Sequence, residues 1–139
     1  MLKVDTKLKK CSLKEEHTLG PLPFEFRQYT QFSGIHYNDL YFSINDGDNC
    51  IKVGSSYGLI RNICKGPCDE SEPVVFFERF IEHSDFFTEP LNSSDLGILK
   101  VAKLCGNIES VLLSQIECKF VRIPYKEDFV IIPLLHQFI

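Results

Sequence analysis

The sequence predicts a mainly β protein, a small antiparallel β-barrel with little helix. Residues 57–60, 74–80 and 116–123 are rich in the β-branched and aromatic side chains that favour strands. Leu40, Phe42 and Ile44 alternate with more polar neighbours, which is the period of a half-buried strand. Hydrophobic residues make up 44% of the 139-residue chain, with twelve Phe and no Trp. That content suffices for one phenylalanine-rich core.

The N-terminal segment is predicted to be an arm that precedes the domain. Residues 1–22 are polar and rich in lysine, and a Gly-Pro pair at positions 20 and 21 stands near their end. We therefore expect a flexible lysine-rich arm over residues 1–22 and a single β-barrel domain over residues 23–139. The next elements are a strand over residues 24–32, a turn at Ser33 and Gly34, a strand over 40–44, a bend at Asp46 and Gly47, and a return strand through Ile51 and Val53.

The C-terminal half continues the pattern, so we expect about seven or eight strands in all. Residues 74–81 are apolar on both faces, which predicts a central strand covered on two sides. The other predicted strands cover 57–63, with a bulge at Gly58, and 98–104, 116–123 and 129–132. We predict an acidic loop over 64–73 and an aromatic and acidic loop over 83–94. Residues 109–115 are a short helix candidate.

Charge and composition narrow the class of protein. The formal net charge is −4, whereas the N-terminal segment holds five lysines and three acids, a net of +2 that leaves −6 for the rest. This balance gives no overall attraction to nucleic acid. The longest mainly apolar run, residues 129–139, is too short to span a membrane. Six cysteines without a secretory signal predict free thiols and an intracellular location.

The sequence contains weak candidates for chemistry but no assembled catalytic group. Cys64 and Cys68 have the spacing of half a zinc site, and a second pair at short spacing is missing. Cys118 and His136 could meet as a nucleophile and its base, although a cysteine in an apolar strand usually behaves as a small hydrophobe. We therefore predict no enzyme activity, no metal site and no cofactor.

The best candidate binding site is the predicted loop that follows the central strand. Exposed aromatic rings beside carboxylates suit a cationic partner such as a lysine-bearing peptide. In the alternative interpretation, the two adjacent phenylalanines fold back and fill the end of the barrel. The candidate binding residues are Glu82, His83, Asp85, Phe86, Phe87 and Glu89.

The order of three segments resembles the bromo-adjacent homology pattern. These are YGLIRNI at 57–63, VVFFERF at 74–80 and ESVLLSQIECKFVRIPY at 109–125. The order of Cys118 and Lys119 is reversed relative to that pattern, and Phe76 or Phe77 stands where the family has a tryptophan. The chain is also similar to the C-terminal region of uncharacterised metazoan transposon-derived proteins. Both resemblances imply a β-barrel interaction module linked to chromatin or to a mobile-element protein in the nucleus.

These observations lead to one functional expectation and one alternative. We expect a non-catalytic protein-interaction module whose partner is a protein or a basic, histone-like peptide. The alternative is a module similar to an oligonucleotide-binding fold, which holds single-stranded nucleic acid on aromatic rings over a positive groove. Its candidate basic residues are Lys100, Lys103, Lys119 and Arg122.

Overall fold

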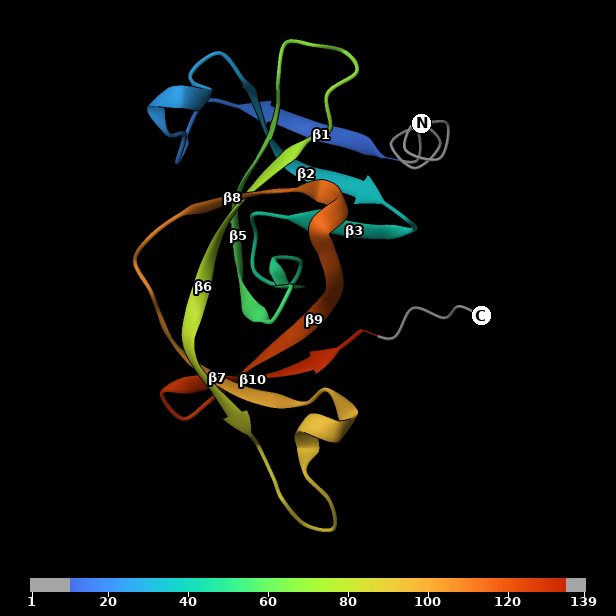
Figure 1. The fold of residues 1–139 in the computed structure, drawn as a ribbon, viewed down its shortest axis with the longest axis vertical. Coiled ribbons are helices and arrows are strands. Elements are labelled where there is room, and N and C mark those ends of the chain that lie inside the picture. The colour runs from blue at the N-terminus through green and yellow to red at the C-terminus, as the bar shows by residue number, and fades with distance from the viewer. Residues whose placement is uncertain (1–10, 135–139) are drawn as a thin grey trace.

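A computed structural model describes residues 11–134 as one ten-stranded antiparallel sheet (Figure 1). The mainly β class is confirmed, and the described residues form no α-helix. None of them forms a helix that is long and apolar enough to cross a membrane. The strands are β1 (Ser12–His17), β2 (Thr30–Tyr37), β3 (Leu40–Ser43), β4 (Cys50–Val53), β5 (Ser56–Lys65), β6 (Val74–Asp85), β7 (Leu99–Leu104), β8 (Glu109–Leu112), β9 (Ile116–Tyr125) and β10 (Asp128–Pro133).

Six of the strands close into a ring in the order β5-β4-β9-β10-β7-β6, and pairing of β5 with β6 completes it. The register between β5 and β6 shifts between Ile60 and Asn62, a bulge of the kind that helps a sheet bend. Strands β1, β2, β3 and β8 extend the sheet beyond the ring. The expected seven or eight strands therefore number ten in the described part of the chain.

The central strand is where the apolar run predicted it. Val74, Val75, Phe76 and Phe77 are all buried, and β6 pairs with β5, β7 and β8 along its length. Phe77 packs into the main core cluster with Ile60, whose backbone lies opposite it in β5. The strand also continues to Asp85, four residues beyond the predicted end, because its pairing with β7 runs as far as Asp85 opposite Leu99.

The predicted arm needs a correction. Residues 1–10 of it lie outside the described residues, but Ser12–His17 form β1 and pair with β2. Leu13 lies opposite the fully buried Ile35 and packs against the main core cluster, and this apolar contact holds a segment that is otherwise polar. Further along, the Asn62 side-chain amide donates to the Pro21 carbonyl at 2.8 Å.

Three other local predictions were shifted or wrong. Residues 24–32 contain the short 3₁₀ turn η1 (Phe24–Phe26) before β2 begins at Thr30. Gly34 lies within β2 rather than in a turn. A glycine is needed there because the Tyr41 ring packs where a side chain would stand. The helix candidate over 109–115 is β8 followed by the 3₁₀ turn η3 (Leu113–Gln115), since β8 pairs with β6.

Candidate functional site

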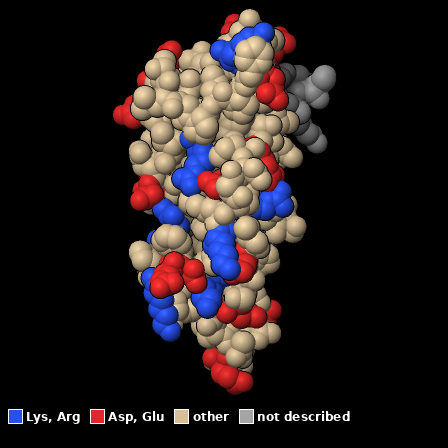
Figure 2. Space-filling model, turned by 90° about the vertical axis from the view of Figure 1, so that its left-hand side faces the viewer, with Lys and Arg blue, Asp and Glu red and all other residues tan. Residues whose placement is uncertain are grey.

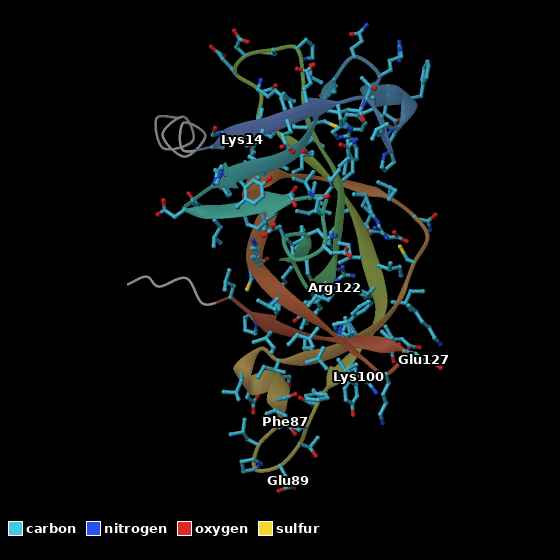
Figure 3. The ribbon with its side chains drawn as sticks, turned by 180° about the vertical axis from the view of Figure 1, so that it is seen from behind. Lys14, Phe87, Glu89, Lys100, Arg122 and Glu127 are labelled. Atoms are coloured by element: carbon cyan, nitrogen blue, oxygen red, sulfur yellow. The ribbon has the colours of Figure 1, made fainter. Side chains whose placement is uncertain are left out.

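The candidate site lies at the lower end of the molecule in Figure 1, which we call the tip. It comprises the end of β6, the following loop with the 3₁₀ turn η2 (Ser93–Leu96), and the turn between β9 and β10. Figure 3 shows Phe87 and Glu89 at this end and Lys14 at the opposite one. The tip residues used below are Asp85, Phe86, Phe87, Glu89, Leu91, Asp95, Leu96, Tyr125 and Lys126.

One buried side chain organises the loop of the tip. The Ser93 hydroxyl accepts hydrogen bonds from the backbone N–H groups of Phe86 at 2.7 Å and Phe87 at 3.2 Å. It also donates to the Ile98 carbonyl at 2.8 Å, so a single hydroxyl joins both ends of the loop. Ser93 is fully buried, and its own backbone bonds run to Phe87 and Ile98. These bonds constrain the backbone of the loop at the two residues that carry its aromatic rings.

The aromatic residues of the tip form a partly exposed cluster. Phe86 is 39% exposed, and its ring lies edge-to-face with that of Tyr125, with centroids 4.9 Å apart. Phe87 is half-buried beside Phe86, and neither ring belongs to the buried core. Leu91 and Leu96 add exposed apolar surface, with Leu96 at 54%. The geometry favours the first of the two interpretations for Phe86, that of an exposed ring.

The segment that forms the loop of the tip is acidic. The sequence has four acids and no Lys or Arg between Arg79 and Lys100. Figure 2 accordingly shows acidic but no basic side chains at the lower extremity of the face that it presents. Hydrogen bonds from the side chain and the backbone N–H of Ser94 lower the pKa of Asp85, with the backbone bond at 2.7 Å. Asp85 therefore keeps its charge to lower pH than an ordinary aspartate.

Three of the predicted site residues lie on a strand, because β6 continues through them. Glu82, His83 and Asp85 belong to β6, whereas Phe86, Phe87 and Glu89 follow it. Glu82 forms an exposed ion pair with Lys103 at 3.3 Å. The imidazole of His83 lies edge-to-face against the Tyr57 ring, with centroids 5.2 Å apart, so it packs against β5.

Sequence reasoning missed Tyr125, which contacts Phe86 although 39 positions separate the two residues in the chain. The only local signal of it is an aromatic residue placed directly before the polar run at 126–128. Its role depends on the closed ring, which places the β9–β10 turn at the same end as the loop after β6.

The basic side chains of the nucleic-acid alternative are largely engaged within the protein. Lys119 is only 7% exposed, and its ammonium group donates to the Tyr41 carbonyl and to Asp48, the latter at 2.8 Å. Arg122 pairs with Asp46 at 2.7 Å and lies over the ring of Phe129. These aspartates come from the turn between β3 and β4, so the turn neutralises two cations of β9.

Lys119 also borders a groove of about 330 Å³ between β3 and β9. Its apolar walls include Leu40, Phe42 and Ile116, and Leu134 lies at the same groove. The ammonium bridges the backbone of β3 to the β3–β4 turn, so Lys119 acts as a structural strut in this wall. An ammonium with two such partners has one of its three donors left for a ligand.

The cysteines are free thiols in very different surroundings. Cys64 is buried against Val74 and Phe76, whereas Cys68 is exposed in the following loop. Burial raises the pKa of both Cys50 and Cys64 to about 12, and it also raises that of Cys118. Within residues 11–134, no cluster of three or more His, Cys, Asp or Glu side chains could hold a metal. His136, the predicted partner of Cys118, lies outside the described residues.

Comparison with known proteins identifies a family. The family described as Domain of unknown function (DUF8592) matches residues 16–134, and the chain belongs to it. No curated protein and no solved structure matches the chain.

Proposed function

We propose that this DUF8592 domain is a non-catalytic protein-interaction module that binds a basic peptide segment at its tip. The observation that carries the proposal is the exposed Phe86 ring, which contacts Tyr125 and belongs to a segment, residues 80–99, with four acids and no Lys or Arg. An aromatic ring attracts an ammonium or guanidinium group by its face, and nearby carboxylates strengthen that attraction.

The construction of the tip supports binding rather than a purely structural role for these residues. The hydrogen bonds of Ser93 restrain the loop, and a restrained loop loses less entropy when a partner docks. Leu91 and Leu96 supply apolar surface around the charges, as in the mixed surfaces of protein interfaces. The net charge of the chain is negative, so a cationic partner is attracted at long range as well.

The rival functions have less support from the geometry. Lys103, Lys119 and Arg122 are ion-paired within the protein, which reduces the positive surface that a nucleic acid would need. A cysteine nucleophile needs a depressed thiol pKa, whereas burial raises that of Cys118. The nuclear, chromatin-linked setting implied by the bromo-adjacent homology resemblance is part of this proposal and rests on the quoted motifs alone.

The proposal predicts that Phe86→Ala weakens binding of a basic peptide. Fluorescence anisotropy with a labelled tetralysine peptide measures the affinity, and tetraglutamine is the uncharged control. Loss of one cation–π contact corresponds to about 0.5–2 kcal/mol, a several-fold loss of affinity. Val121→Ala is the matched control, because Val121 is 43% exposed on β9 and lies outside the tip as defined.

Two outcomes would contradict the proposal. In one, Phe86→Ala and Val121→Ala bind tetralysine as tightly as the wild-type chain does. In the other, Phe86→Ala unfolds the domain, which would make the ring part of the core. This second outcome is excluded if the circular dichroism spectrum and the melting temperature of Phe86→Ala match those of the wild-type chain.

A further inference from the structure

A lysine of the chain itself already occupies an aromatic face at the tip. The Lys126 ammonium lies 5.3 Å from the centroid of the Tyr125 ring. The same ring is the one that Phe86 contacts edge-to-face. An ammonium within about 6 Å of a ring centroid is in the range of a cation–π interaction. Lys126 thus shows which ring of the tip accepts a cation.

The backbone at Lys126 gives a second, independent observation. Lys126 and Glu127 form the two-residue turn between the paired residues Tyr125 and Asp128. Lys126 has a φ of +56°, a left-handed conformation that is uncommon for a residue with a side chain. Glycine is the usual residue where the first position of a tight hairpin turn has positive φ. The strained turn position therefore holds a lysine whose side chain reaches the Tyr125 ring, although a glycine would fit the backbone better.

We propose that Lys126 is an internal competitor, and that a lysine or arginine of the partner displaces its ammonium from the Tyr125 ring. This inference rests on the proposed function, because it concerns the same site and the same cationic partner. A partner cation that stacks on Tyr125 must first displace Lys126, and the lost internal contact reduces the measured affinity. Lys126 is exposed, so its side chain is free to leave the ring and enter solvent.

Removing the competitor should therefore strengthen binding, whereas removing Phe86 weakens it. Lys126→Gln is expected to bind the labelled tetralysine peptide about two- to fivefold more tightly than the wild-type chain, which is the equivalent of one exposed cation–π contact. Lys126→Arg keeps a cation on the ring, so it is expected to bind no more tightly than wild type. The measurement is anisotropy on the full chain at physiological ionic strength.

The control must separate displacement from a simple change of charge. Lys100→Gln removes one positive charge near the same end of the molecule, where Figure 3 shows Lys100, and no ring contact of Lys100 occurs among the described residues. Lys14→Gln removes one at the opposite end. Both should change the affinity for tetralysine much less than Lys126→Gln does.

The outcomes distinguish this inference from the proposed function. Tighter binding by Lys126→Gln alone supports both. If the wild-type chain binds tetralysine but Lys126→Gln binds no more tightly than Lys100→Gln, Lys126 is not a competitor. The proposed binding function then stands. If neither the wild-type chain nor Lys126→Gln binds the peptide, the proposed function fails and the inference fails with it.

Discussion

Replacing Phe77 with alanine is expected to lower the free energy of unfolding by about 3–5 kcal/mol. Phe77 is 1% exposed and packs in the main core cluster with Ile35, Ile60 and Val75. It also lies on the β5–β6 pairing that closes the ring, so the loss of its volume leaves a cavity where two strands meet. Urea denaturation followed by circular dichroism measures the change.

Phe24→Ala is the control for this substitution. Phe24 is 75% exposed, and its only described ring contact is the Arg27 guanidinium at 4.1 Å. Its removal should cost less than about 1 kcal/mol, the range of an exposed cation–π pair. Equal losses for Phe24→Ala and Phe77→Ala would mean that the core described here is wrong.

Gly58→Ala is expected to destabilise the domain by about 3 kcal/mol or more, the upper range for overpacking. A Cβ atom at Gly58 would lie 2.2 Å from the Glu78 carbonyl oxygen and 2.8 Å from the Arg79 Cα atom. Both are backbone atoms of β6, which cannot move away without opening the β5–β6 pairing. Thermal unfolding should show a large drop in melting temperature.

Gly47→Ala separates this close approach from backbone strain. Gly47 has a φ of +97°, but an added Cβ atom would meet nothing within 4 Å. The cost there is conformational, about 1–2 kcal/mol for an L-residue in a left-handed conformation. If Gly58→Ala is no worse than Gly47→Ala, the tight contact between β5 and β6 is not present in solution.

Local patterns in the sequence were sufficient for much of the fold. The alternation at Leu40 and Phe42 and the apolar run of β6 both became strands, because side-chain burial acts through periodicity that a short window contains. The pattern failed for β1, where Leu13 is the one apolar residue and the other five residues are polar, as in a solvated arm. It also failed for β8, whose strand conformation comes from its pairing with β6 rather than from its own residues.

The candidate site was predictable in part for the same reason. Phe86 and its acidic neighbours stand close together in the chain, so the aromatic and acidic pattern was visible. Tyr125 reaches Phe86 only through the closed ring of strands, a long-range contact that no local pattern encodes. The organising role of Ser93 was equally hidden, since a buried serine hydroxyl has no sequence signature.

The most direct test of tip binding is a titration of the isotopically labelled chain with the tetralysine peptide, followed by the backbone amide resonances. Binding at the tip predicts saturable shifts at Phe86, Phe87, Ser94, Tyr125 and Lys126, which weaken as salt is raised because the contact is partly electrostatic. Shifts centred instead on the groove at Ile116 and Lys119, or no saturable shifts at low salt, would contradict the claim that the tip binds a basic partner.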